Sequence, residues 1–428
     1  MLATTTAVLL LLIALSLPIA VVLGVLALFL DYTYAFLPLY RAFGENFWAH
    51  NTDFVLAAIP LFIMMGELML RSGIADRMYA AMAQWLSWLP GGLMHANIGT
   101  CAAFAATSGS SVATAATIGT VAMPQIERRG YNERLFLGSL AAGGTLGILI
   151  PPSINMIVFG FLTDTSVPRL FLAGIIPGLM LTGLFMLVIG IACVIQPRMD
   201  GNREETSWSG RWRALVDLLP PIGLFIIVVG SIYAGWATPT EAAALGVLAS
   251  VGLAALNRRL TLETIRQTAE GTIRTSAMMI LILIVSFFLN FVFASIGLVE
   301  VVNNFILGLG WTPLQTMLLI IGIYLILGMF METLAMVVLT VPIITPVVIA
   351  LGYDPVWFGI MVVLLSETAI LTPPIGMLCF VIQGIRGRGR LDDVFIGVTP
   401  FVVALMVMLG LMLAFPGISM FLPNFFYG

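Results

Sequence analysis

Hydrophobic residues occur along the chain in long runs that are separated by short polar stretches. Nine of these runs approach or exceed the roughly 20 apolar residues that a helix needs to cross a bilayer. They lie at about 5–30, 54–70, 134–162, 169–195, 215–235, 238–256, 276–297, 356–384 and 395–423. The pattern predicts an all-α polytopic membrane protein, in which the first run is a membrane helix rather than a removed signal peptide.

Two further apolar runs, at about 93–125 and 312–350, are interrupted in the middle by small and polar residues. The interruptions are the segments 107–111 (TSGSS) and 331–333 (MET). Backbone groups that leave a helix inside a bilayer need partners from protein or from enclosed water. We therefore expect two re-entrant helical hairpins, each of which enters the membrane, turns at mid-depth and leaves on the same side.

Two of the spanning runs carry the same five-residue break. The sequences ILIPP at 148–152 and ILTPP at 370–374 are 222 residues apart, and Pro124 and Pro346 upstream are separated by the same number. Adjacent prolines remove two amide donors and disfavour helix at the preceding residue. The pattern predicts two broken helices, one in each half of the chain, an arrangement typical of the binding site of a secondary transporter.

The charges give this arrangement an orientation. All 18 basic residues are arginine, and 16 of them lie in or beside the stretches 71–77, 128–134, 196–213, 257–274 and 386–393. If these stretches are cytoplasmic, the excess of positive charge is on the inside, as expected for a membrane protein. The ends of the two hairpins then face opposite sides of the membrane. The two halves are therefore predicted to be inverted structural repeats.

This interpretation divides the chain into three parts. Residues 1–195 form the first repeat, and residues 276–428 form the second repeat with the final span. Residues 196–275 connect them through two spans and an arginine-bearing segment that is predicted to lie as an arm helix along the cytoplasmic interface. The pair Pro220-Pro221 in this connection is predicted to begin a helix, where proline is well tolerated.

Composition excludes several classes of function. The chain is 60% hydrophobic and 9% charged, against about 25% charged residues in soluble domains. It lacks a phosphate-binding GxxxxGK[ST] loop and the GxSxG and HExxH motifs, so neither ATP hydrolysis nor an intramembrane enzyme is expected. Cys101, Cys193 and Cys379 lie in apolar runs and are expected to be buried hydrophobic residues. The arginines at 386–390 are interpreted as a cytoplasmic anchor rather than a nucleic-acid-binding segment.

Acidic residues within apolar runs are candidates for function, because charge inside a bilayer is costly. Glu332 lies at the turn of the second hairpin, where the 222-residue offset matches it with Ser110, and Glu367 matches Thr145. Hydroxyls, carboxylates and carbonyls freed at helix breaks suit a hard cation or a proton. The alternative is that each glutamate accepts hydrogen bonds from amides at a helix end and contacts no ion.

Four segments together resemble the large membrane subunit of the TRAP transporters, the tripartite ATP-independent periplasmic transporters. They are SGSS at 108–111, GGTLGILIPPS at 143–153, ETLAM at 332–336 and SETAILTPPIG at 366–376, and the resemblance extends over essentially the whole chain. It implies an elevator-type transporter of the bacterial inner membrane that imports a small organic acid with a sodium gradient. It also implies a periplasmic substrate-binding protein and a small four-helix membrane subunit as partners, with membrane lipid around them. The length suggests the form in which the two membrane subunits are not fused.

The resemblance also implies specific sites, with sodium as the coupling ion and no other cofactor. Sodium site 1 would comprise Ser108, Gly109, Ser110 and Ser111 with Thr145, Gly147 and Pro151. Sodium site 2 would comprise Glu332 and Thr333 with Thr368, Thr372 and Pro373. The substrate would lie between the hairpin tips, with Ser153, Asn155, Ser110 and Glu332 as candidate contacts. The alternative function is a stand-alone cation-coupled anion symporter of similar hairpin architecture.

Overall fold

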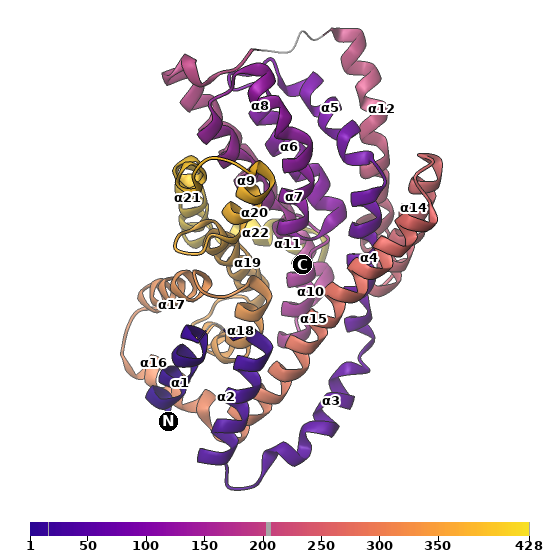
Figure 1. Cartoon of the computed structure of the whole chain (residues 1–428). Coiled ribbons are helices and arrows are strands. Elements are labelled where there is room, and N and C mark those ends of the chain that lie inside the picture. The colour runs from indigo at the N-terminus through magenta and orange to yellow at the C-terminus, as the bar shows by residue number, and fades with distance from the viewer. Residues whose placement is uncertain (16, 203–206, 428) are drawn as a thin grey trace.

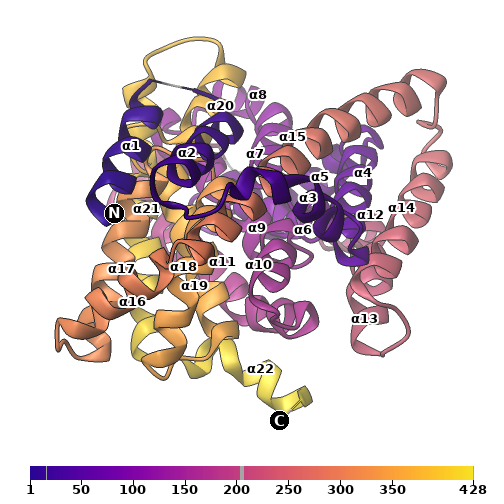
Figure 2. The same cartoon turned by 90° about the horizontal axis from the view of Figure 1, so that it is seen from below.

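The computed structural model describes residues 1–15, 17–202 and 207–427, with only the backbone described at Leu307. Within these ranges the regular secondary structure is entirely helical. Eight of the described helices are long and apolar enough to cross a membrane, which confirms the all-α polytopic architecture. Figures 1 and 2 show the whole chain in two views.

The helices follow one another along the chain in two series. The first comprises α1 (Leu2–Ala14), α2 (Ile19–Tyr34), α3 (Phe43–Asn51), α4 (Ala58–Arg71), α5 (Ile74–Leu86), α6 (Leu93–Ser108), α7 (Ser111–Ala122), α8 (Pro124–Arg129), α9 (Glu133–Leu149), α10 (Ile154–Thr163) and α11 (Val167–Ile195). The second comprises α12 (Trp208–Phe225), α13 (Ser231–Tyr233), α14 (Pro239–Leu256), α15 (Leu262–Ser295), α16 (Leu298–Gly308), α17 (Pro313–Gly328), α18 (Thr333–Ala350), α19 (Pro355–Leu371), α20 (Met377–Arg386), α21 (Leu391–Ala414) and α22 (Gly417–Tyr427).

Both predicted hairpins are present as pairs of packed helices. Hairpin 1 consists of α6 and α7, which pack against each other on either side of a turn at Gly109. Hairpin 2 consists of α17 and α18, which are joined by residues 329–332. Each hairpin thus turns at the small and polar residues that interrupt its apolar run.

Both predicted helix breaks are also present. Break 1 is the segment 150–153 between α9 and α10, and break 2 is the segment 372–376 between α19 and α20. The backbone leaves the helix in the same way in both places, with φ −85° and ψ 124° at Ile150 and φ −89° and ψ 136° at Thr372. Each of these residues precedes a Pro-Pro pair, which favours extended backbone over helix.

Two predicted spans are each divided in the structure, so their prediction as single helices is wrong. The run at 5–30 forms α1 and α2, which pack against each other and are separated before Pro18, an extended residue with ψ 136°. The final run at 395–423 forms α21 and α22, with a departure from helix at Phe415 before Pro416. In both places the hydrophobic run continues across a proline that the helix does not pass.

The central connection differs from its prediction in two respects. The arm segment and the following span form one continuous helix, α15, whose 34 residues correspond to about 51 Å of length. It packs along α2, α3 and α4 and is the long diagonal helix of Figure 1. Pro220 and Pro221 lie inside α12 rather than at its start, because Ser207 caps that helix earlier by accepting a hydrogen bond from the Gly210 amide at 3.0 Å.

The order of elements in the first half recurs in the second. A helix is followed by a glycine turn, a short helix, a hairpin, a broken helix and a long helix. The two glycine turns have nearly the same conformation, with φ 71° at Gly73 before α5 and φ 72° at Gly297 before α16. This recurrence agrees with two structural repeats, while their inversion across the membrane and the three-part division of the chain stay predictions.

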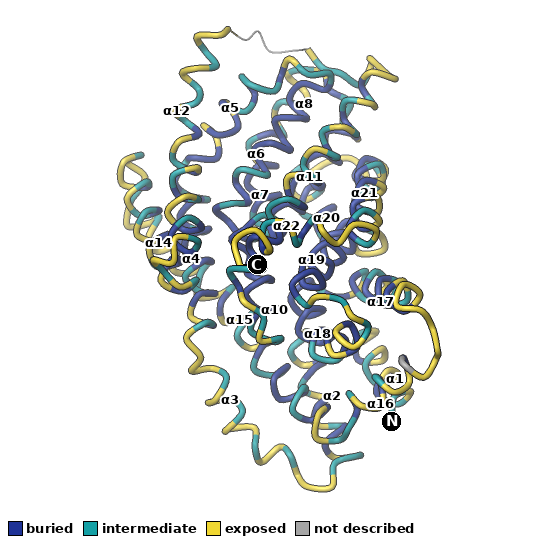
Figure 3. The backbone as a smooth tube through the Cα atoms, turned by 180° about the vertical axis from the view of Figure 1, so that it is seen from behind, coloured by how far each residue is buried: buried dark blue, intermediate teal, exposed yellow. Residues whose placement is uncertain are grey.

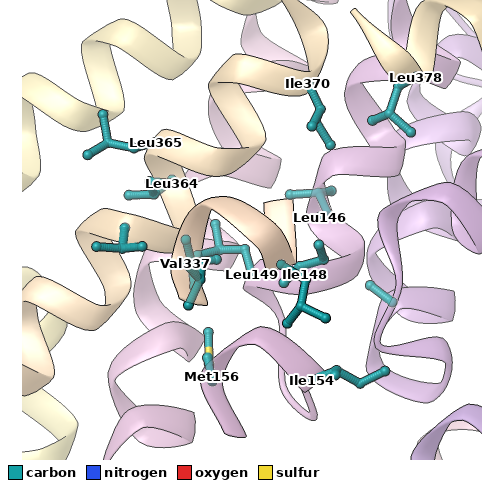
Figure 4. Close-up of a cluster of buried hydrophobic side chains, with 14 of the residues drawn as sticks. Leu146, Ile148, Leu149, Ile154, Met156, Val337, Leu364, Leu365, Ile370 and Leu378 are labelled. Carbon is teal, nitrogen blue, oxygen red and sulfur yellow. The ribbon is translucent and has the colours of Figure 1, made fainter. Parts of the chain in front are cut away.

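The buried core lies around the two broken helices. Every residue from Leu135 to Leu149 in α9 and from Val356 to Leu371 in α19 is buried. Both helices lie in the middle of the molecule in Figure 1, and α19 is dark blue in Figure 3. Apolar side chains of α9 and α10 lie beside those of α18 and α19 at the breaks (Figure 4). The two halves of the chain therefore share one core.

An ion-pair network joins the far ends of the two broken helices. The Arg386 side chain, 4% exposed at the end of α20, lies 2.9 Å from Glu133 at the start of α9 and 3.4 Å from Asp393 in the first turn of α21. Arg134 pairs with the other Asp393 oxygen at 2.9 Å. Helices from both repeats are thus held together at this end of the core.

Helices α9 and α21 cross closely at a pair of glycines. A Cβ atom at Gly397 would overlap the carbonyl oxygen of Arg134, and one at Gly138 would overlap the carbonyl oxygen of Gly397. The partners are backbone atoms, which cannot rotate away as a side chain does. Only glycine permits this distance between the two helices.

We predict that Gly397→Ala destabilises the protein by about 1–3 kcal/mol, the usual cost of overpacking. Thermal unfolding of the purified protein in detergent measures the effect. Gly410→Ala is the matched control, because Gly410 is on the same helix and has open space around it. The control should be neutral or slightly stabilising, since alanine is the better helix former. An equal loss of stability in both variants would contradict the close crossing.

Candidate functional site

The tip of hairpin 1 is built from hydroxyl-bearing residues and one glycine. Gly109, with φ 61°, ends α6 in the left-handed conformation that glycine adopts without strain. Ser110 then caps α7 by accepting a long hydrogen bond from the Ala113 amide at 3.4 Å. The Ser108 and Thr114 hydroxyls are hydrogen-bonded to each other at 2.8 Å. The last carbonyls of α6 have no following helical turn to donate to them, whereas the Ser110 carbonyl accepts a hydrogen bond from the Thr114 amide at 3.0 Å.

This tip lies directly against break 1. A Cβ atom built on Gly147 would be 2.6 Å from the Ser110 carbonyl oxygen, and one on Gly109 would be 3.0 Å from the Pro152 carbonyl oxygen. The Thr145 hydroxyl donates to the Ala142 carbonyl at 2.6 Å, which leaves lone pairs on its oxygen as potential ligands. A carbonyl oxygen from the tip and one from break 1 thus lie at the contact between the two segments, and such oxygens suit a hard cation.

Hairpin 2 is capped differently. Glu332 caps α18 by accepting a hydrogen bond from the Ala335 amide at 3.2 Å, and the Thr333 hydroxyl lies 3.2 Å from the other carboxylate oxygen. This is the role expected of a glutamate that satisfies amides at a helix end. The capping does not use all the acceptor positions of the carboxylate, which has about four.

Break 2 faces hairpin 2 as break 1 faces hairpin 1. A Cβ atom on Gly328, at the end of α17, would overlap that of Ala369 in the last turn of α19. The Thr368 hydroxyl donates to the Leu364 carbonyl at 2.8 Å, and the Thr372 hydroxyl donates to the Thr368 carbonyl at 2.6 Å. Both threonines therefore keep oxygen lone pairs at the point where α19 ends.

A small cavity of about 50 Å³ lies between the two hairpin tips. Polar residues from three elements line it: Ser110 and Ser111 of hairpin 1, Asn155 of α10, and Glu332 and Thr333 of hairpin 2. Ligand pockets for organic molecules measure roughly 300–1,000 Å³. The arrangement in this conformation has room for an ion or water between the tips, and an organic acid would require the tips to separate.

A larger cavity of about 570 Å³ lies on the other side of Glu332. Its walls come from α1, α2 and the end of hairpin 2 and are otherwise apolar. Glu332 contributes to the lining of both cavities. The glutamate at the tip of hairpin 2 therefore borders both spaces.

The two predicted substrate contacts outside the hairpins have different surroundings. Asn155 lines the small cavity, and its buried side-chain nitrogen has no hydrogen-bond partner among the described residues. Ser153 instead caps α10, accepting a hydrogen bond from the Met156 amide at 3.5 Å, and it is not among the residues that line the cavity. The geometry therefore favours Asn155 over Ser153 as a substrate contact.

The remaining predicted residues lie where the hairpins and breaks meet. For sodium site 1, Ser108–Ser111 form the tip of hairpin 1, and Thr145, Gly147 and Pro151 lie at the end of α9 and in break 1. For sodium site 2, Glu332 and Thr333 begin α18, and Thr368, Thr372 and Pro373 lie at the end of α19 and in break 2. Their assignment as sodium ligands stays a prediction.

One contact of the site was not predicted. The Ser111 hydroxyl in hairpin 1 donates to Glu367 of α19 at 2.7 Å, and both residues are buried. Glu367 is visible in the sequence as an acid within an apolar run. Its partner is not, because the two residues are 256 positions apart and belong to different repeats.

The donor atoms at the hairpin tips are oxygens. Within the part of the chain that the structure describes, no group of three or more histidine, cysteine or acidic residues could hold a metal ion. The three cysteines are free and buried, as predicted for small hydrophobic residues. The hairpin tips offer hydroxyls, carbonyls and single carboxylates, a set of oxygen ligands suited to a hard cation.

A polytopic helical protein in which two hairpin tips meet two helix breaks has the architecture of a secondary transporter. Comparison with known proteins agrees. Residues 6–418 match the family described as tripartite ATP-independent periplasmic transporter, DctM component. The chain belongs to this family of transporter permease subunits, which are not enzymes.

Relatives include the C4-dicarboxylate TRAP transporter large permease protein DctM of Rhodobacter capsulatus, 31% identical over 96% of both chains. The sialic acid TRAP transporter large permease protein SiaM of Vibrio cholerae is 33% identical over 92% of this chain and 93% of its own. The isethionate TRAP transporter permease protein DctMQ of Oleidesulfovibrio alaskensis is 33% identical, with 94% of this chain matching 63% of that longer protein.

A solved structure has a similar fold. The YdaH transporter of Alcanivorax borkumensis superimposes with a TM-score of 0.64 over 89% of this chain and 88% of its own. The sequence identity is 14%, so the similarity concerns the fold alone.

We predict that Gly147→Ala displaces the tip of hairpin 1 from break 1, because the added Cβ would lie 2.6 Å from the Ser110 carbonyl oxygen. The expected loss of stability is about 1–3 kcal/mol, measured by thermal unfolding, together with a fall in transport. Gly190→Ala on α11 is the control, since nothing lies within 4 Å of its new Cβ. Wild-type stability and transport in Gly147→Ala would contradict the close contact.

Proposed function

We propose that this chain is the transport subunit of a sodium-driven importer for a small organic acid in the bacterial inner membrane. A periplasmic substrate-binding protein delivers the acid, and a small four-helix membrane subunit partners the chain. The observation that carries the proposal is the small cavity between the two hairpin tips, which is lined by Ser110, Ser111, Asn155, Glu332 and Thr333. Membership of the TRAP family supports the tripartite organisation.

An anionic substrate is supported by the helix ends at this cavity. Two of the residues that line it, Ser110 and Ser111, are at the N-terminus of α7, and Asn155 is in the first turn of α10. The N-terminus of a helix offers free amides and a positive partial charge, which attract carboxylates. Relatives named for C4-dicarboxylates, sialic acid and isethionate agree with an organic acid as the substrate class.

Sodium coupling is supported by the oxygen atoms at the two places where a hairpin tip meets a break. Sodium site 1 uses the tip of hairpin 1 with break 1, and sodium site 2 uses the start of α18 with break 2. Ions bound there would be coordinated by carbonyl, hydroxyl and carboxylate oxygens and would hold tips and breaks together around the substrate. This makes closure of the substrate site depend on the gradient.

The transport movement is of the elevator type in this proposal. The hairpins and broken helices form the moving unit, and helices α4, α12, α14 and α15 form the part that stays against the membrane. The ion pairs of Arg386 with Glu133 and Asp393 support a moving unit that includes helices from both repeats.

Reconstitution tests the tripartite organisation. We expect proteoliposomes that contain this chain and its small subunit to take up the acid only when the binding protein and an inward sodium gradient are both present. The control is an equal gradient of potassium, which should give no uptake. Uptake by this chain alone would overturn the tripartite proposal in favour of a stand-alone symporter.

Substitution of single hydroxyls tests the sodium sites. Ser110→Ala and Thr368→Ala should each raise the sodium concentration for half-maximal uptake by about tenfold, equivalent to ~1.4 kcal/mol, while expression stays normal. Thr182→Ala is the control for Thr368→Ala, because each hydroxyl donates to a carbonyl four residues earlier and Thr182 lies on α11. Sodium activation that is unchanged in both site variants would count against the assignment.

A further inference from the structure

Glu367 is buried in the middle of the molecule and contacts the other repeat. It lies in the last turns of α19 with 0% exposure, and its Oε1 atom accepts a hydrogen bond from the Ser111 hydroxyl at 2.7 Å. Ser111 begins α7 at the tip of hairpin 1, so it belongs to sodium site 1. A carboxylate from the second repeat thus lies at the site formed by the first.

The second oxygen of this carboxylate has no partner. Glu367 Oε2 is buried and makes no hydrogen bond to any described residue. Arg134 on α9 and Arg386 on α20, two helices that pack on α19, both pair with Asp393, and Arg386 also pairs with Glu133. A buried carboxylate is costly without an opposite charge, and the described ion pairs supply none to Glu367.

The surroundings of Ser111 indicate what supplies that charge. The Ser111 carbonyl oxygen would lie 3.2 Å from a Cβ on Gly144, and the Ser111 Cα would lie 2.8 Å from one on Gly147. The backbone of Ser110 and Ser111, with both of its carbonyl oxygens, therefore lies against the end of α9. One carboxylate among neutral oxygens suits a monovalent cation, whereas Ca²⁺ and Mg²⁺ need several oxygen ligands and usually more than one charge.

We infer that Glu367 is a positioning residue for sodium site 1. It holds the Ser111 hydroxyl by a hydrogen bond and places a negative charge from the second repeat beside that site. The inference deepens the proposed function and rests on it. It also explains an asymmetry between the repeats. The residue that matches Glu367 in the first repeat is Thr145, which is neutral. Both carboxylates of the two sites, the half-buried Glu332 and the buried Glu367, thus come from the second repeat.

The test is sodium binding by the purified full-length chain in detergent, measured as the sodium concentration that gives half of the maximal thermal stabilisation. Potassium replaces sodium to keep the ionic strength constant, and the pH is fixed. Glu367→Gln keeps an acceptor for the Ser111 hydroxyl but removes the charge. We expect its midpoint for sodium to rise by about tenfold or more, while its stability without sodium is equal to or above that of the wild type.

Control variants separate this effect from a general loss of charge or of structure. Glu270→Gln removes one carboxylate from an exposed part of α15 and should leave the sodium midpoint unchanged. Glu367→Asp keeps the charge but withdraws it by one methylene, and it should raise the midpoint severalfold. If Glu367→Gln does not fold, Glu367→Asp decides the question.

The outcomes are distinct. A sodium midpoint equal to that of the wild type in Glu367→Gln, or in Glu367→Asp where only that variant folds, would overturn the role of Glu367 and leave sodium coupling intact. A wild-type chain that sodium does not stabilise more than potassium would overturn sodium binding itself, and the inference with it. A raised midpoint with normal stability in the absence of sodium supports the inference.

Discussion

The backbone groups that a helix releases when it breaks inside a membrane must find partners within the protein, because lipid offers none. Most of the arrangement around the core follows from this constraint. Each Pro-Pro break frees carbonyls at the end of one helix, and each hairpin tip frees carbonyls and amides at its turn. The structure brings a tip against a break twice, so that the freed groups are enclosed by protein. Polar atoms are thereby concentrated at two buried positions.

The same constraint is met with different side chains in the two halves. Hairpin 1 is capped by a serine hydroxyl and approaches a glycine, whereas hairpin 2 is capped by a glutamate and approaches an alanine. The backbone of the two breaks is nearly the same, but the charge around them is not. Two sites that are similar in architecture therefore differ in electrostatics, and we expect them to differ in affinity for the same ion.

The sequence predicts the hairpins and the breaks because their signals are local. Proline pairs, a glycine turn and polar residues within an apolar run each act over a few residues. The division between α1 and α2 also has a local signal, Pro18, but the hydrophobic run continues across it. The continuity of α15 has none, since it depends on packing against α2 and α4, where Gly271 lies against Glu67. The Ser111–Glu367 contact requires the tertiary fold, and no spacing in the sequence indicates it.

The Arg386 network has a mechanical consequence. Arg386 follows break 2 at the far end of α20, and its partner Glu133 begins the helix that ends at break 1. Because the guanidinium is almost completely buried, added salt screens these pairs only weakly. A displacement of either broken helix is thus transmitted to the other through a stiff joint remote from both breaks. In the proposed sodium-driven movement, an ion that bound at one break would therefore displace both broken helices together.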